Sequence, residues 1–241
     1  MARIHTPSPC AILFDLDGTL LDSIADITAS VNRAIGRFGF PPRSESEYRR
    51  AVGDGIEELI RRMLPPEAVK DPRFPKIRDT TVREYREDVT RKTRPYPGIL
   101  SLLDTLSEAG IPLGILTNKP EELALKSVTA LLPSSRFITV KGAVPGTPAK
   151  PDPGKALEIA ALFGRPPAQV LLVGDSEIDI LTARNAGMIS VAVSWGFRER
   201  EKLKQYHPRY LIDAPEDLLS ILDTLTRTRD AACDNKGTVR T

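Results

Sequence analysis

Two aspartates, Asp15 and Asp17, stand two positions apart directly after a run of apolar residues, in the stretch AILFDLDGTLLDS from 11 to 23. Burying a carboxylate is costly unless a positive charge or hydrogen-bond donors pair with it. A chain that places two carboxylates at the end of a buried strand therefore needs a partner for them. Ser23 is better placed to cap the helix that follows, so we expect the two aspartates to carry chemistry.

Further polar residues follow the later apolar segments in the same way. They are Thr117 and Asn118 at the end of 111–118, Lys150 after 137–140, and Asp175 at the end of 168–175, with Asp179 one helical turn on. Ligands of open α/β sheets bind outside the carboxyl ends of the strands, so we expect these groups to converge. Adjacent carboxylates repel one another, and a divalent cation would stabilise them. A set of oxygen ligands without histidine favours Mg²⁺ over zinc.

The composition limits other kinds of chemistry. The chain of 241 residues has only two histidines, His5 in a proline-flanked segment and His207 directly before a proline. A serine–histidine–aspartate hydrolase or a multi-histidine metal site is hard to build from them, so catalysis must rest on carboxylates and lysine. Cys10 and Cys233 lie near opposite ends and have neither disulfide nor zinc spacing.

Charge and hydropathy favour a cytoplasmic protein that acts on small molecules. The 34 basic and 32 acidic residues leave a formal net charge of +2, which gives no reason to expect nucleic acid or an anionic membrane as partner. No apolar run approaches the ~20 residues of a membrane-spanning helix, and we expect no signal peptide before Asp15. The sequence leaves the oligomeric state open between monomer and homodimer.

Short apolar segments alternate with helical segments along most of the chain. This alternation predicts an α/β fold, a doubly wound parallel sheet covered by helices on both faces. The expected strands are 11–14, 111–118, 137–140, 168–175, 189–196 and 210–212. The expected helices between them are 23–38, 121–132, 153–163, 178–186 and 215–226.

One region lacks a good strand and predicts a helical cap inserted between the first two core strands. Within it, Ser44 and Glu47 form a capping-box pattern, 56–64 has one apolar helical face, and a longer polar helix is expected over 73–91. The predicted domains are a core of 1–22 and 93–226, a cap of 23–92, and a frayed, disordered tail of 227–241.

The stretches DLDGT, LTN, KP and GDSEID resemble, in this order, the four motifs of the haloacid dehalogenase-like phosphohydrolases. The resemblance covers about residues 11–225, and the helical insertion is similar to the cap of that family. The stretches AVGDGIEELIRR, YPGI and WGF look most like bacterial phosphoglycolate phosphatases. The resemblance implies a Mg²⁺-dependent phosphatase for a small anionic phosphate ester, with 2-phosphoglycolate as the first candidate.

The resemblance also implies roles for the aspartates. Asp15 would be the nucleophile that forms an aspartyl-phosphate. Asp17 would protonate the leaving oxygen and then take a proton from the hydrolytic water. Mg²⁺ would be held by Asp15, the backbone carbonyl of Asp17 and Asp175.

The other motif residues would act on the phosphoryl group and its surroundings. Thr117, with the Asn118 amide, would hold phosphoryl oxygens, and Lys150 would neutralise charge on nucleophile and phosphate. Asp179 would support the site by orienting Lys150 or a metal-bound water.

Candidate substrate contacts are Gly18, Thr19 and the cap loop of Gly53, Asp54 and Gly55. Backbone N–H groups at the start of a helix can bind an anion such as a glycolate carboxylate. The Gly53–Gly55 loop fits equally well the plain start of a helix, with Asp54 near the positive amino end.

Other functions remain open on the same scaffold. A sugar phosphate, such as a phosphorylated amino sugar, or pyrophosphate would need the same chemistry. A phosphomutase or a catalytically silent binding protein is a further alternative, because the fold alone does not fix the function. The intact set of Asp15, Asp17, Lys150 and Asp175 argues against a silent protein.

Overall fold

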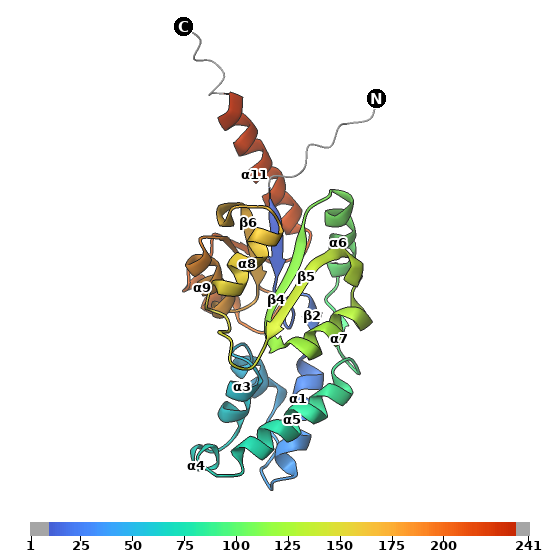
Figure 1. Ribbon diagram of the computed structural model, residues 1–241, viewed down its shortest axis with the longest axis vertical. Helices are drawn as coiled ribbons and strands as arrows, with labels where there is room; N and C mark the ends of the chain where they lie inside the picture. Colours follow the sequence, from blue (N-terminus) through green and yellow to red (C-terminus); the bar gives the residue numbers. More distant parts are fainter. Residues whose placement is uncertain (1–9, 235–241) are drawn as a thin grey trace.

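The computed structural model describes the backbone of residues 10–234 and the side chains of residues 10–227 (Figure 1). Its centre is a six-stranded sheet in the order β5-β4-β1-β6-β7-β8, and every pairing is parallel. The strands are β1 (Ala11–Phe14), β4 (Leu113–Pro120), β5 (Phe137–Ala143), β6 (Val170–Gly174), β7 (Ile189–Val193) and β8 (Tyr210–Ile212). The predicted doubly wound parallel sheet is therefore confirmed.

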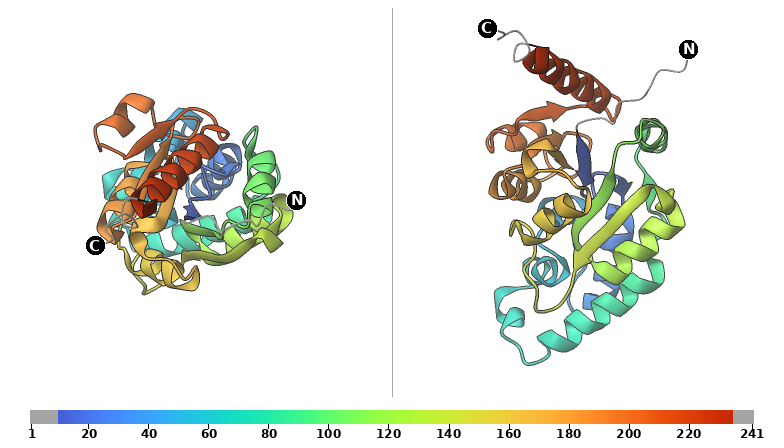
Figure 2. Two further views of the ribbon diagram at one scale, coloured as in Figure 1. Left: turned by 90° about the horizontal axis from the view of Figure 1, so that it is seen from above. Right: turned by 45° about the horizontal axis from the view of Figure 1, so that its top comes forward.

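Helices cover both faces of this sheet, as the near-continuous burial of β1 and β6 requires (Figure 2). The covering helices are α6 (Ile99–Glu108), α7 (Glu121–Leu131), α8 (Gly154–Leu162), α9 (Glu177–Ala186), α10 (Arg200–Lys204) and α11 (Asp217–Asp234). Along β1, Ile12 and Phe14 belong to one apolar cluster, which also holds residues of α6, α7 and α11. Ala11 and Leu13 belong to a second cluster with residues of α8 and α9.

The last helix differs from the prediction. It was expected to end at 226, but α11 continues to Asp234, so the prediction of a frayed tail is wrong for 227–234. The polar composition of this stretch suggested a loss of order, yet the backbone continues the helix begun by the buried Leu218, Ile221 and Leu222. Residues 235–241 of the predicted tail lie outside the described residues.

The segment between β1 and β4 forms a helical cap at the end of the molecule opposite to α11 (Figure 1). Its helices are α1 (Ile24–Gly36), α2 (Glu45–Ala51), α3 (Ile56–Met63), α4 (Pro66–Val69) and α5 (Phe74–Asp88). The predicted capping box is confirmed, since Glu47 N donates to Ser44 Oγ and Ser44 N donates to Glu47 Oε2 at 2.8 Å. The apolar cluster of the cap includes Leu123 and Phe197 from the core, so the two parts share one packed interface.

A short antiparallel ribbon that the sequence did not predict joins the two parts. It pairs β2 (Leu21–Asp22) with β3 (Arg94–Pro95), where the chain leaves the core and returns. Next to it, the buried carboxylate of Asp26 accepts hydrogen bonds of 2.7–3.0 Å from Lys92 N and from the N–H and hydroxyl of Thr93. These bonds fix the start of α1 against the returning strand. In the described part of the chain, no helix has the length and apolar character needed to cross a membrane.

Candidate active site

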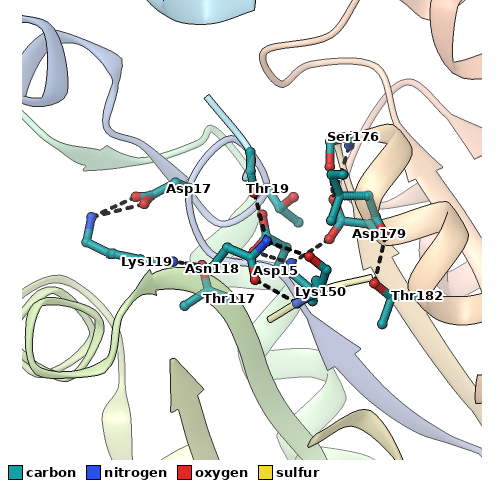
Figure 3. A network of polar contacts seen from close by, with 12 residues as sticks. Asp15, Asp17, Thr19, Thr117, Asn118, Lys119, Lys150, Ser176, Asp179 and Thr182 are labelled. Atoms are coloured by element: carbon teal, nitrogen blue, oxygen red, sulfur yellow. Dashed lines mark hydrogen bonds and ion pairs between the residues drawn. The ribbon is translucent and has the colours of Figure 1, made fainter. Parts of the chain in front are cut away.

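A buried lysine joins two of the predicted aspartates at the carboxyl edge of the sheet (Figure 3). Lys150 Nζ donates to Asp15 Oδ1 at 2.8 Å and to Asp179 Oδ1 at 2.6 Å. Asp15 directly follows β1, Lys150 lies in the loop after β5, and Asp179 lies in the first turn of α9. Asp15 meets Lys150 and Asp179, more than a hundred residues further along the chain, because the parallel strands that precede the three residues, β1, β5 and β6, end at the same edge of the sheet.

The start of α9 explains how Asp179 is held. Its Oδ2 accepts hydrogen bonds from Ser176 N at 3.1 Å and from Ser176 Oγ at 2.6 Å, which caps the helix. Both carboxylate oxygens of Asp179 therefore already have protein donors, one from Lys150 and the other from Ser176. This arrangement suits a residue that orients Lys150.

Asp175 lies beside this group at the end of β6. It accepts hydrogen bonds from Phe197 N at 2.7 Å and from Thr19 Oγ1 at 3.3 Å. Gly18 packs against the same carboxylate at a φ of +87°, and a Cβ at this position would lie 2.4 Å from Asp175 Oδ2. The predicted substrate contacts Gly18 and Thr19 thus lie against Asp175, and only a glycine fits at the first of them.

The carboxylates outnumber the positive charges of this cluster. Burial raises the pKa of Asp175 to about 8, and the charges of Asp15 and Asp179 add to that increase. Burial also raises the pKa of Asp15 to about 6, although Lys150 opposes it. Burial on its own would lower the pKa of the Lys150 amine, but Asp15 and Asp179 together raise it above its ordinary value.

The geometry fits a divalent cation. Oxygens of Asp15, Asp175 and Asp179 all lie within 4.8 Å of one another, and all three side chains are buried. These donors are carboxylate oxygens, which hard cations prefer. Asp179 is bonded to the Lys150 ammonium and to both donors of Ser176, whereas Asp175 accepts one short bond, from Phe197 N, and a longer one of 3.3 Å from Thr19. Asp15 and Asp175 are therefore the side chains that would hold the ion.

Asp17 belongs to a different group. Its carboxylate turns away from Lys150 and accepts hydrogen bonds from Lys119 Nζ at 2.9 and 3.1 Å (Figure 3). The side chain of Lys119 is only 1% exposed, and its Nζ also donates to the hydroxyl of Tyr85, on cap helix α5, at 2.5 Å. The sequence analysis missed Lys119 and Tyr85. The lysine directly follows Asn118, but a lysine at a strand end is most often solvated, and nothing in the pattern of α5 marks the tyrosine.

Thr117 and Asn118 lie between these two groups, near the end of β4. Thr117 Oγ1 accepts a hydrogen bond of 3.2 Å from Lys119 N. The Asn118 side chain accepts from Lys150 N at 2.9 Å and donates to the carbonyls of Lys150 at 3.0 Å and Gly53 at 2.9 Å. The Asn118 carboxamide therefore fixes the Lys150 loop and the cap loop to each other.

A cavity of about 60 Å³ lies between core and cap. Its core side includes Asp15, Asp17, Thr117, Asn118 and Lys119, and its cap side includes Ile27, Val52, Gly53, Gly55, Ile56, Leu59 and Tyr85. Of the three predicted cap contacts, the two glycines line the cavity. Asp54 does not line it, because its carboxylate pairs with Arg62 at 2.6 Å.

A third unpredicted residue, Arg198, holds the cap loop against the core. Its buried guanidinium donates to the carbonyls of Arg49, at 2.7 Å, and of Val52 in the cap. On the core side its Nε donates to Glu177 Oε2 at 2.9 Å. The guanidinium therefore fixes the chain just before Gly53 relative to the start of α9.

Comparison with known proteins agrees with this geometry. A family described as haloacid dehalogenase-like hydrolase matches residues 12–193. Phosphoglycolate phosphatase of Agrobacterium fabrum is 35% identical over 86% of this chain and 88% of that protein. Phosphoglycolate phosphatase 1 of Pseudomonas aeruginosa is 31% identical over 90% of this chain and 81% of that protein. A crystal structure described as a predicted phosphoglycolate phosphatase from Haemophilus somnus superposes with a TM-score of 0.82, at 29% identity over 91% and 99% of the two chains.

Proposed function

This chain belongs to the haloacid dehalogenase-like hydrolases and is a phosphatase, and we propose that it hydrolyses 2-phosphoglycolate with Mg²⁺ through an aspartyl-phosphate on Asp15. The observation that carries this proposal is the position of Asp15. Its carboxylate lines a cavity between core and cap, is held at one oxygen by Lys150, and has an oxygen within 4.8 Å of one of Asp175.

The first step is attack on phosphorus. Lys150 binds Asp15 Oδ1, which leaves Oδ2 to form the bond to phosphorus while the bond to the ester oxygen breaks. Thr117 and the backbone N–H of Asn118 bind phosphoryl oxygens from the end of β4. Asp15, Asp175 and the carbonyl of Asp17 would hold Mg²⁺. When bound, the ion supplies positive charge that offsets the charges of the phosphate and the carboxylates.

The second step returns the enzyme to its starting state. In its protonated form Asp17 gives a proton to the leaving oxygen in the first step. As a carboxylate it then accepts a proton from the water that attacks phosphorus, which breaks the bond to Asp15 and releases inorganic phosphate. To do so, its carboxylate must turn from Lys119 towards the leaving oxygen. Asp179 keeps Lys150 in place through both steps.

The cavity supports a small substrate. Apart from Tyr85, its cap side consists of apolar side chains and glycine backbone, which offer few partners to the hydroxyl groups of a sugar. Closure of the cap also keeps bulk water away from the acyl phosphate until the leaving group has gone. A two-carbon acid such as glycolate suits this space better than a sugar.

A substrate panel with purified protein tests the proposal. We expect kcat/KM for 2-phosphoglycolate to exceed the values for sugar phosphates, phosphorylated amino sugars, nucleotides and pyrophosphate by at least about tenfold, which is about 1.4 kcal/mol of transition-state selectivity. Chelation should abolish turnover and Mg²⁺ should restore it. A tenfold preference for a sugar phosphate or pyrophosphate would assign the protein to another substrate, and full activity in excess chelator would remove the metal from the mechanism.

A further inference from the structure

Lys119 is a buried cation that lines the cavity together with Asp15 and Asp17. Among the described residues that line the cavity, it is the one cationic side chain, and Asp15 and Asp17 are the two acidic ones. A buried ammonium is stable only with a close counter-charge, and here both oxygens of Asp17 provide it at 2.9 and 3.1 Å. The third N–H of Lys119 Nζ is used by the Tyr85 hydroxyl.

We infer that Lys119, together with the hydroxyl of Tyr85, binds the carboxylate of the substrate and thereby selects carboxylate-bearing phosphate esters. This inference rests on the proposed function and adds the residue that recognises the acid. Asp15 can receive the phosphoryl group in the cavity. A carboxylate on the substrate brings a second negative charge, and among the described lining residues Lys119 is the cation available to stabilise it.

Because Lys119 is already paired with the carboxylate of Asp17, a substrate carboxylate can replace it at a small cost in free energy. A substrate carboxylate that takes the place of the Asp17 carboxylate replaces one ion pair by another of the same kind, so Lys119 keeps a counter-charge. Asp17 is then released from Lys119 and can turn towards the leaving oxygen, as its role requires.

The surroundings restrict the anchor to a short acid. Ile27, Ile56 and Leu59 form apolar walls, which suit a methylene group but stabilise no charge. Tyr85 comes from α5 of the cap, whereas Lys119 comes from β4 of the core. The binding site for the carboxylate is therefore complete only when cap and core are together.

The experiment compares two phosphate esters, of which only one carries a carboxylate. 2-Phosphoglycolate and ethyl phosphate share the two-carbon chain, with a methyl group in place of the carboxylate in the second. Lys119→Met keeps the length of the side chain and removes its charge. It should lower kcat/KM for 2-phosphoglycolate relative to that for ethyl phosphate by about 10²-fold, as expected for a lost charge-assisted contact, since the loss of the pair with Asp17 affects both esters and cancels in this ratio.

Two further variants serve as matched controls. Lys119→Arg keeps the charge and should retain most of the preference for the acid. Tyr85→Phe removes only the hydroxyl and should weaken the preference by about threefold to tenfold. An equal loss on both esters in Lys119→Met would overturn the inference, because Lys119 would then serve only to place Asp17 or to support the fold.

A measurement on the wild-type protein covers the case in which Lys119→Met does not fold. Glycolate should inhibit competitively, and ethylene glycol, which has a similar size, should not. Equal inhibition by the two compounds, or no inhibition by glycolate, would overturn the proposal that Lys119 binds the substrate carboxylate. If the wild type prefers a sugar phosphate in the substrate panel, the proposed function fails. If it prefers 2-phosphoglycolate and Lys119→Met keeps that preference, only the carboxylate anchor fails.

Discussion

The core and the cap contribute to the same cavity by different means. The core supplies charged side chains at strand ends, and these are bonded to one another, as Lys150 is to Asp15 and Asp179. Apart from Tyr85, the cap supplies apolar side chains and the backbone of Gly53 and Gly55. Arg198 of the core holds this glycine loop in place by a hydrogen bond to the carbonyl of Val52. We infer from this difference that core carboxylates and Lys150 perform the chemistry, and that contacts between core and cap select the leaving group. Changes in Asp15 or Lys150 should therefore affect every phosphate ester, and changes in the contacts between core and cap, those of Lys119 and Arg198 included, should depend on the substrate.

The largest effect is expected for Asp15→Asn. The amide has nearly the same size but is a poor nucleophile, so turnover of every ester should fall by about 10³-fold or more. The fold should persist, because the substitution removes one charge from a cluster rich in carboxylates. Steady-state rates with an alkyl and an aryl phosphate check this, and a variant that retains a tenth of the wild-type rate on either would exclude Asp15 as the nucleophile.

Lys150→Met should have the next largest effect, and again on all esters. It removes the cation between two buried carboxylates, so we expect turnover to fall by about 10²-fold and the free energy of unfolding of the metal-free protein to fall by about 3 kcal/mol. Kinetics and urea unfolding measure the two changes. The half-buried Lys155, in α8, offers a control, because its ammonium donates to the Gly142 carbonyl and contacts none of the aspartates, so Lys155→Met should leave the rates unchanged. Loss of activity on only one class of ester would contradict a role for Lys150 in the shared chemistry.

A substitution in the cap contact should instead separate the substrates. Arg198→Met removes the hydrogen bonds to the carbonyls of Arg49 and Val52, which loosens the loop that leads to Gly53. We expect kcat/KM for 2-phosphoglycolate to fall by about tenfold, as for the loss of one charge-assisted contact, and the rate with p-nitrophenyl phosphate to change by less than about threefold. Equal losses on both esters would show that Arg198 supports the core rather than the cap.

The smallest effect concerns pH and the metal. The pKa values of Asp175, about 8, and Asp15, about 6, lie above the ordinary value of 3.8, so the folded state holds protons that the unfolded state has lost. The stability that these protons contribute is full below about pH 4 and is lost as the pH rises through the folded-state pKa values. In chelator, Tm should therefore fall between pH 5.5 and 8.5, and each ~1 kcal/mol of lost stability should lower Tm by ~2–4 °C at this size.

Mg²⁺ should raise Tm more at pH 8.5 than at pH 5.5, because the ion binds ionised carboxylates. Asp175→Asn should reduce both the slope with pH and the response to the ion. A Tm in chelator that does not change over this range would mean that the carboxylates have ordinary pKa values in the folded protein.

The core could be predicted from the sequence because its functional residues lie next to the features that define the fold. Asp15 and Asp175 each follow an apolar run, and the rules for parallel sheets place the ends of such runs together. The contacts between core and cap could not be predicted in this way. Lys119 meets Tyr85 across 34 positions, and Arg198 meets Val52 across 146, through packing that has no local signature. The β2–β3 ribbon was missed for another reason, since strands of two residues are too short to show a period.

The central claim is that the core performs the chemistry through a covalent bond to Asp15, and trapping that bond tests it most directly. Protein mixed with ³²P-labelled 2-phosphoglycolate and Mg²⁺ is quenched in acid within one turnover, and a parallel sample is reduced with borohydride, which converts an aspartyl-phosphate into homoserine. We predict protein-bound label in the wild type and in Arg198→Met, none in Asp15→Asn, and homoserine at position 15 by peptide mass spectrometry. Turnover without label in the wild type, or homoserine at another aspartate, would contradict the mechanism.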